Sequence, residues 1–275
     1  MRHVVLFFAV ILMAAGLGGC IRVSTRIAVK KDGSGTVTER VLMNAPLLKT
    51  MASSSKEGKN GSPGSMPERK SLEKNAAAMG EGVGLKGVRA FSEDGFEGYE
   101  AVYMFRDISK VRVSGRPDEK GTADSLRAAG AAATEGDRIS FRFIKGMPSR
   151  LVIMLPEERT LIDPVKKKDA PAQQQSPEQE KLSLAIIREM FKGTRMTLDI
   201  EVDGTVLSTD ASCRDAVGRI VLADVDFNRL LDAGNDKAML MLTGSGSTSG
   251  SGKELINRVP GIAGETKKQV SVVFQ

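Results

Sequence analysis

Cys20 carries a thiol that can be modified covalently, and it ends an amino-terminal pattern of charge and apolar residues. Arg2 supplies a positive charge, residues 4–15 form an unbroken apolar run, and Leu17-Gly18-Gly19 precede the cysteine. A charged start, a short apolar run and small residues are the parts of a cleavable signal peptide. The run is shorter than the roughly 20 apolar residues that span a bilayer. We therefore expect cleavage between Gly19 and Cys20.

The tetrapeptide that ends at Cys20 resembles the lipobox of bacterial lipoproteins. The resemblance implies that the thiol carries diacylglycerol and that the new amine carries an acyl chain such as palmitate, which together anchor a protein stably to a membrane. Ile21, rather than Asp, follows the cysteine. For a Gram-negative lipoprotein this implies the outer membrane rather than the inner one. The alternatives are an ordinary secretory signal or a buried first helix with an incidental cysteine.

Histidine and cysteine are scarce outside this segment. His3 is the only histidine and lies in the part to be removed, and Cys213 is the only other cysteine. A mature chain without histidine has no Ser-His-Asp triad and no histidine-based zinc site. We interpret Cys213 as a half-buried apolar residue rather than a reactive thiol, since Arg214 is its only flanking cation. We expect no enzyme, catalytic residue, cofactor or metal, although catalysis by Asp, Glu and Lys alone stays open.

A glycine-rich stretch near the carboxyl terminus imitates a phosphate-binding loop. Residues 246–253 read GSTSGSGK, but a P-loop needs Gly at the position of Ser247 and Ser or Thr at that of Glu254. We therefore predict a flexible loop.

Four aspartates could carry chemistry of their own. Asp32 and Asp203 each precede a glycine, and we expect them to shape turns rather than to bind calcium. Asp224 and Asp226 could act as an acid and a base. Because they precede a short apolar helix pattern, helix capping is the favoured interpretation.

The charge of the chain is moderately basic, with a formal net charge of +6. The only dense cluster is Lys166 to Lys168, which we interpret as part of a solvated loop. An exported protein with ten Phe, two Tyr and no Trp is a poor candidate for stacking on nucleic-acid bases. The expected partners are a membrane, reached through the lipid anchor, and envelope proteins or lipids, with no nucleic acid.

Alternating apolar residues predict the elements that position these groups. Residues 21–43 read as a β-hairpin with a turn at Asp32-Gly33, and a second hairpin is expected over residues 86–105. Residues 195–202 give the cleanest alternation, and Asp203-Gly204 is expected to turn them into a third hairpin with residues 205–208. The remaining strands are expected at 139–143 paired with 150–155, at 219–223 and at 269–274. Helical segments are expected at 45–51, 69–79, 107–110, 182–191 and 227–231.

The absence of regular βα alternation excludes a parallel sheet architecture. The sequence therefore predicts an α+β fold, mainly an antiparallel β-sheet built from hairpins, with a few helices and long polar loops. Flexible stretches are expected near 53–67, 114–137, 163–179 and 244–252. We expect residues 20–275 to form one composite domain after removal of the signal peptide 1–19, with two units, 21–162 and 176–275, as the alternative.

Several short motifs resemble the LppM-like family of bacterial lipoproteins. They are Cys20 to Val23, Asp32 to Thr36, Gly98 to Asp107, Arg195 to Thr209 and Ile220 to Leu231. The resemblance implies a role in the envelope without a settled biochemical activity, and it supplies no catalytic residues. Members often carry a carboxyl-terminal transmembrane helix, whereas the apolar stretch Ala238 to Leu242 of this chain is too short to span a bilayer.

Two classes of function follow from these observations. The first is a membrane-anchored, non-enzymatic envelope protein with a structural, assembly or interaction role. The second is a carrier that holds a lipid or another apolar ligand between a curved sheet and the helix around residues 178–192. The thirteen methionines support the carrier, since flexible thioethers suit adaptable apolar pockets, although they also fill ordinary cores.

Overall fold

The computed structural model describes most of the chain after Cys20. The described residues are 21–45, 66–114, 138–156, 184–186, 188–189, 191–236, 238–239 and 255–275. The predicted signal peptide, Cys20, Lys166 to Lys168 and the loop 246–253 lie outside them. So do the expected helix 45–51 beyond its first residue and all but the margins of the four stretches expected to be flexible.

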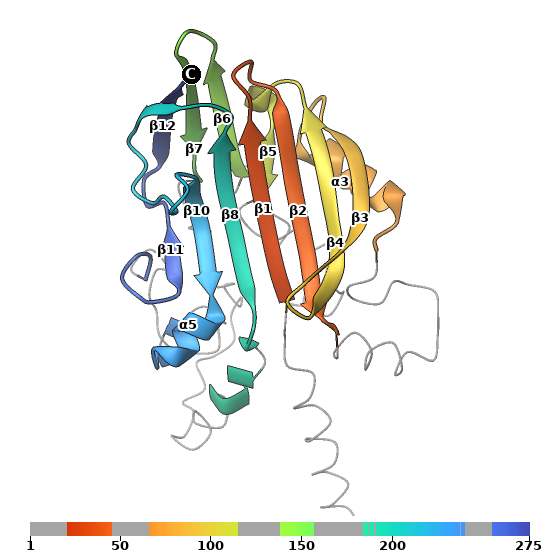
Figure 1. Cartoon of the computed structure of the whole chain (residues 1–275), viewed down its shortest axis with the longest axis vertical. Helices are drawn as coiled ribbons and strands as arrows, with labels where there is room; N and C mark the ends of the chain where they lie inside the picture. Colours follow the sequence, from red (N-terminus) through yellow and green to blue (C-terminus); the bar gives the residue numbers. More distant parts are fainter. Residues whose placement is uncertain are drawn as a thin grey trace, which may run out of the picture.

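Two β-sheets build the molecule (Figure 1). The larger sheet has seven strands in the order β11-β10-β8-β1-β2-β4-β3. Its strands are β1 (Ile21–Val29), β2 (Gly35–Asn44), β3 (Gly84–Glu93), β4 (Phe96–Phe105), β8 (Arg195–Val202), β10 (Ile220–Asp226) and β11 (Ile262–Gly264). The neighbours are antiparallel except β1 and β8, which run parallel.

The smaller sheet has five antiparallel strands in the order β5-β6-β7-β12-β9. They are β5 (Arg112–Ser114), β6 (Arg138–Ile144), β7 (Ser149–Met154), β9 (Val206–Thr209) and β12 (Gln269–Phe274). One continuous apolar core joins the sheets: Ile27 and Val37 of the larger sheet and Leu151 and Val272 of the smaller one are fully buried in it. The other face of the larger sheet is therefore left for polar side chains.

Short helical segments cover the margins of this sandwich. α3 (Arg69–Met79) buries Leu72, Ala76 and Met79 in the shared core, and η1 (Ile108–Lys110) is a single 3₁₀ turn. α5 (Phe227–Asp232) packs Phe227 and Leu230 into a second apolar cluster below the sheets. The helical residues between 184 and 191 end at Phe191, whose ring stacks on Phe227 with centroids 4.7 Å apart.

The expected α+β class is wrong, because the described chain is mostly β. The helices at 69–79, 107–110 and 227–231 were correctly located, yet none of them forms a layer. The two sheets bury each other's apolar faces, so the core needs no helical layer. The sequence also missed β5 and β11, whose three residues each are too short to show an alternating pattern.

The first two hairpins and the β6–β7 pair are confirmed. The third hairpin is wrong: β8 pairs with β1 and β10, whereas β9 crosses to the smaller sheet and pairs with β12. At the crossing, the Asp203 N–H donates to the Val29 carbonyl oxygen, and Gly204 adopts a φ of 152°. An alternating pattern shows which face of a strand is buried and does not identify its neighbour.

Candidate functional site

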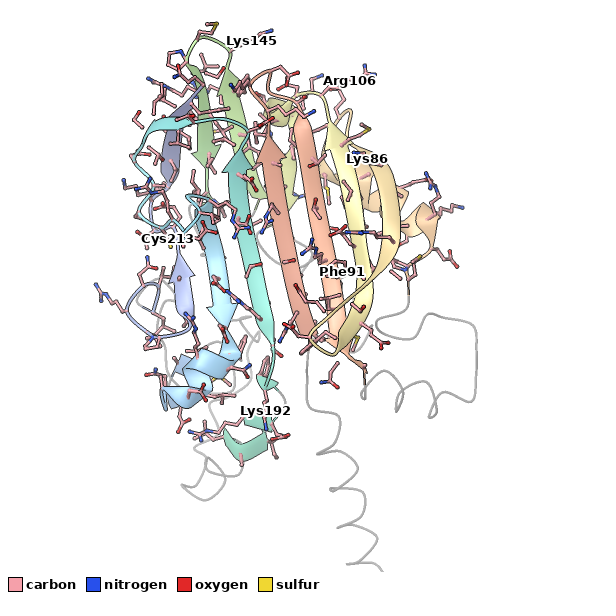
Figure 2. The ribbon with its side chains drawn as sticks, in the orientation of Figure 1. Lys86, Phe91, Arg106, Lys145, Lys192 and Cys213 are labelled. Atoms are coloured by element: carbon pink, nitrogen blue, oxygen red, sulfur yellow. The ribbon has the colours of Figure 1, made fainter. Side chains whose placement is uncertain are left out.

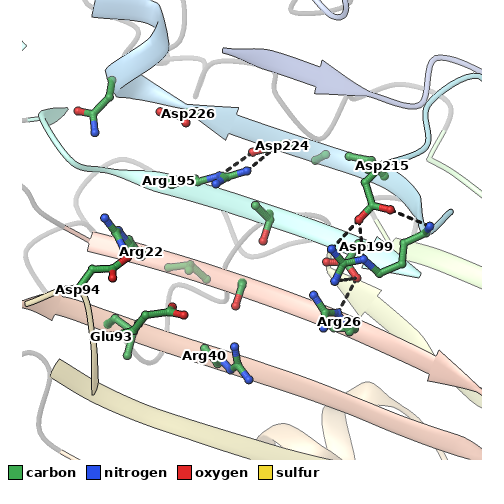
Figure 3. Close-up of a pocket in the computed structure, with 18 of the residues that line it drawn as sticks. Arg22, Arg26, Arg40, Glu93, Asp94, Arg195, Asp199, Asp215, Asp224 and Asp226 are labelled. Carbon is green, nitrogen blue, oxygen red and sulfur yellow. Dashed lines mark hydrogen bonds and ion pairs between the residues drawn. The ribbon is translucent and has the colours of Figure 1, made fainter. Parts of the chain in front are cut away.

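A charged groove of about 690 Å³ lies on the polar face of the larger sheet. Figure 3 shows its floor, formed by β1, β2, β8 and β10, with the β3–β4 turn and the loop before β10 at its margins. Every second residue of a strand points to the same face of a sheet. Arg22, Ser24 and Arg26 of β1 therefore enter the groove, while Ile27 and Val29 are buried in the core.

An ion-pair cluster around Asp199 occupies one end of the groove. The parallel register places Arg26 directly beside Asp199, and Arg26 Nε donates to Asp199 Oδ1 over 2.8 Å. Arg219 approaches the same carboxylate to 3.9 Å and is held by Asp215 over 2.5 Å. Asp199 is 8% exposed, and its burial raises the pKa of its carboxyl group although Arg26 opposes this. Ionisation of the Asp199 carboxyl group is therefore favoured by its arginine neighbours and opposed by burial.

A second set of ion pairs lies at the other end of the groove, next to the start of β1. Arg195 donates from Nε and Nη2 to the two oxygens of Asp224 over 3.1 and 2.9 Å, and these bonds raise the pKa of the guanidinium. Arg22 donates to Asp94 of the β3–β4 turn over 3.2 Å and lies 3.9 Å above the Phe96 ring. Bidentate pairing fixes the plane of Arg195, so this end is pre-organised.

The charged face continues beyond the groove across β2, β4 and β3. Glu100 is 5% exposed and accepts from Arg40 over 2.6 Å and from Arg89 over 2.7 Å. Burial opposes ionisation of Glu100, but the two guanidinium groups outweigh it and lower its pKa. Arg40 also lies 4.4 Å above the ring of Phe91. Arginine–carboxylate ion pairs thus lie on six neighbouring strands, from β3 to β10, with arginines on both β2 and β1 in the middle of the sheet.

This arrangement presents positive and negative groups side by side on the surface of the sheet. Each guanidinium group offers hydrogen-bond donors, and each carboxylate offers acceptors. Within the described ranges, no group of three His, Cys, Asp or Glu residues is arranged to hold a metal ion. The groove therefore suits a polar ligand, or a polar surface of another protein, that carries both signs of charge.

The structure places the four aspartates of the sequence analysis in separate roles. Asp32 accepts from the backbone N–H and the hydroxyl of Ser34, so it shapes the β1–β2 turn as expected. Asp203 begins the crossing to β9. Asp226 caps α5 by accepting from the Arg229 N–H over 3.2 Å, which confirms the capping role. Asp224 caps nothing and pairs with Arg195 instead.

Cys213 is a half-buried free thiol. Burial raises its pKa, and the nearby Glu265 raises it further. The thiol is therefore protonated at neutral pH, in agreement with its interpretation as an apolar residue.

Sequence reasoning missed the charged groove and the buried carboxylate of Glu265. Glu265 is 4% exposed and accepts from the backbone N–H groups of Ser212, Thr266 and Lys267. It also accepts from the Ser212 hydroxyl, so it ties the loop before β10 to the start of β12. Its flanking Gly264 and Thr266 give no local sign of burial. Arg26 and Asp199 are 173 positions apart, and only the pairing of β1 with β8 joins them.

None of the helices in the described ranges has the length and apolar character needed to cross a membrane.

No protein-family model matches the chain, and no curated protein sequence matches it. Among solved structures, the chain is similar to the NMR structure of the folded domain of the Mycobacterium tuberculosis LppM protein. The similarity covers 94% of this chain and 91% of that one, with 11% sequence identity and a TM-score of 0.30. It is a weak similarity at the level of the fold, and no residue role is transferred from it.

Proposed function

We propose that this chain is a lipid-anchored, non-enzymatic envelope protein that binds a polar partner through the charged face of its larger sheet. The observation that carries the proposal is the Leu17-Gly18-Gly19-Cys20 tetrapeptide after a signal-like apolar run, followed at once by β1. Lipidation of Cys20 would place two kinds of acyl chain next to the first residue of the sheet.

The position of β1 supports a fixed arrangement at the membrane. β1 lies between β8 and β2, and Ile21 is already in register with Met43 of β2. A lipidated Cys20 would therefore have no flexible linker before the sheet. The end of the groove that contains Arg22, Asp94 and Arg195 would lie nearest to the lipid.

The partner is expected to be another envelope protein with a polar surface of mixed charge. A face that carries both guanidinium and carboxylate groups favours such a surface, because like charges that face each other are costly and complementary ones select the partner. The carrier hypothesis has less support. The core between the sheets is filled by buried side chains, and the described grooves are open at the surface and lined by charged and apolar side chains together.

Intact-mass measurement of the protein extracted from membranes tests the anchor. We expect a mature chain that starts at Cys20 with the added mass of a diacylglyceryl group and one further acyl chain. A Cys20→Ala variant should lose this mass and be released from the membrane fraction by a high-salt wash. A Cys213→Ala variant is the matched control and should keep both. An unmodified Cys20 in the extracted protein would disprove the anchor.

The membrane itself is tested by separating inner and outer membranes on a density gradient. We expect the wild-type protein in the outer membrane because Ile21 follows the lipidated cysteine. An Ile21→Asp variant should move to the inner membrane of a Gram-negative host. Wild-type protein found mainly in the inner membrane would contradict this assignment.

Crosslinking tests the partner-binding role. A photoreactive residue at Val217, which lines the groove and is 77% exposed, should capture an envelope protein in intact cells. The same photoreactive residue placed at Met66, which is 49% exposed and outside the groove, should not capture that protein. Equal products from both positions would count against the groove as a binding face.

A further inference from the structure

We propose that the end of the molecule opposite the start of β1 binds the surface of an anionic phospholipid bilayer. This end, called the distal tip, consists of residues 30–34, 106–110 and 142–150. It contains the β1–β2 turn, the segment after β4 with η1, and the β6–β7 turn with its flanks. Figure 2 shows Arg106 and Lys145 at this end and Lys192 at the other.

The three segments of the distal tip form one surface because hydrogen bonds join them. The Ile108 N–H donates to the Gly33 carbonyl oxygen over 2.9 Å. The Phe143 N–H donates to the Ser109 hydroxyl over 2.9 Å, and the Ser149 hydroxyl donates to the Lys31 carbonyl oxygen over 3.2 Å. The charges on the three segments are therefore held beside one another.

The distal tip is strongly basic. Its cations are Lys30, Lys31, Arg106, Lys110, Arg142, Lys145 and Arg150, and all of them are exposed. Among the described residues only Lys110 of this set has an ion pair, which it forms with Glu81 over 2.9 Å. The two carboxylates of the tip, Asp32 and Asp107, are engaged by the backbone N–H groups of Ser34 and Ser109. At the border, Asp203 and Glu201 lie near Lys30 and Glu81 pairs with Lys110, so seven cations meet five carboxylates and an excess of positive charge remains.

Apolar side chains project from the same surface. Met147 in the β6–β7 turn is 101% exposed, and Ile144 at the end of β6 is 47% exposed. An exposed methionine beside lysines and arginines matches the interface of an anionic bilayer, where an apolar side chain enters the headgroup region and cations contact phosphates. A protein surface that matched the tip would need an acidic patch with an apolar pocket; the bilayer is favoured because Met147 extends from a turn rather than forming a flat patch.

The opposite end of the sheets carries both signs of charge, since Arg22 and Arg195 lie there in ion pairs with Asp94 and Asp224. Glu93, Asp94 and Glu97 lie in and beside the β3–β4 turn, near the start of β1. The nine residues of β1 lead from Ile21 towards the tip, which is a rise of about 26 Å at roughly 3.3 Å per residue. If Cys20 is anchored as proposed above, the tip is directed away from the anchoring membrane. It would then contact a second lipid surface, so the protein would bridge two membranes.

Vesicle capture tests the distal tip without relying on the lipid anchor. The full chain, attached to beads through an amino-terminal tag, is mixed with fluorescent vesicles of phosphatidylcholine alone or with 30 mol% phosphatidylglycerol. We expect capture of the anionic vesicles, weakened by high salt, and little capture of the neutral ones. Each cation near an anionic surface contributes about fivefold in affinity, so Lys145→Glu should weaken capture by about tenfold or more. Met147→Ser should weaken it several-fold.

Two exposed positions outside the tip supply matched controls. Lys86→Glu on β3 repeats the charge reversal, and Ile186→Ser, at a residue 52% exposed, repeats the loss of an apolar side chain. Both should capture anionic vesicles as wild type does, and thermal unfolding by circular dichroism checks that all four variants fold. Equal capture of both vesicle types, or equal losses in tip and control variants, would overturn the proposal. Capture only of vesicles that retain membrane proteins would also overturn it and would identify the tip as a protein-binding surface.

Discussion

Glu100 shows how strongly a single carboxylate depends on its neighbours across strands. It is buried between Arg40 of β2 and Arg89 of β3, which lower its pKa. We expect Glu100→Gln to reduce the free energy of unfolding by about 1–2 kcal/mol at pH 7, since hydrogen bonds to charged groups contribute that much and the arginines are partly exposed. Urea denaturation measures the change. Glu97→Gln, on the same strand but exposed, should change it by less than about 0.5 kcal/mol.

The pH dependence of this difference gives a further check. A carboxyl group whose pKa is lowered by folding stabilises the folded state above its ordinary pKa, and this stabilisation is lost as the pH falls through the lowered value. The difference between wild type and Glu100→Gln should therefore be full at pH 7 and shrink on acidification below about pH 4. If the difference in the free energy of unfolding stayed constant down to pH 3, the ionised carboxylate of Glu100 would not stabilise the folded state.

Asp199 presents the opposite case, because burial raises its pKa despite the bond from Arg26. Arg26→Ala should raise this pKa further by removing the nearest guanidinium. When folding raises the pKa of a carboxyl group, the folded state is most stable at a pH below the group's ordinary pKa. Its stability then decreases as the pH rises through the raised pKa. The variant should therefore lose more stability than wild type between pH 4 and pH 7. NMR titration of the Asp199 carboxyl carbon measures the shift directly; Arg22→Ala, whose partner Asp94 is exposed, should leave that titration unchanged.

At the scale of the strand, Gly98 shows how closely β2 and β4 approach each other. A Cβ atom at Gly98 would lie 2.0 Å from the Val41 carbonyl oxygen, which no rearrangement of a side chain relieves. We expect Gly98→Ala to lower the free energy of unfolding by about 1–3 kcal/mol. Gly87→Ala on neighbouring β3 is the matched control, because a Cβ there meets no atom within 4 Å. Thermal unfolding of both variants decides the point, and equal melting temperatures would contradict the close approach.

The elements also show how far the sequence could predict the fold. The β1–β2 and β3–β4 hairpins were predicted because both strands and their turn are adjacent in the chain, and Gly33 adopts the positive φ that such a turn requires. The position of β8 was not predicted, since its neighbour β1 is more than 160 residues away. The Arg26–Asp199 pair, and with it the charged groove, follows only from that long-range register. Local patterns determine strands and turns, whereas the order of strands depends on the packing of the whole core.

At the scale of the whole molecule, the parts of the chain before residue 163 and after residue 179 are expected to unfold together as one cooperative unit. Residues before 163 and after 179 contribute strands to both sheets: β1 pairs with β8 in the larger sheet, and β7 pairs with β12 in the smaller one. Ile27, Leu151, Ile200 and Val272 from the two parts are buried in one core. Either part of the chain alone would therefore leave β1 or β8, and β7 or β12, without one of its neighbouring strands and would expose apolar side chains that the other part covers.

We accordingly expect that cleavage between residues 163 and 179 leaves two fragments that stay associated and unfold together. Limited proteolysis followed by gel filtration should yield both fragments in one peak, with a single thermal transition. Residues 21–162 and 176–275 produced separately should lack the fold by circular dichroism and recover it when they are mixed, because the β1–β8 and β7–β12 pairings form only between them. Two fragments that separated and each unfolded cooperatively would show that the chain consists of two domains, and that the charged groove, which uses β1 and β8 together, is an interface between them.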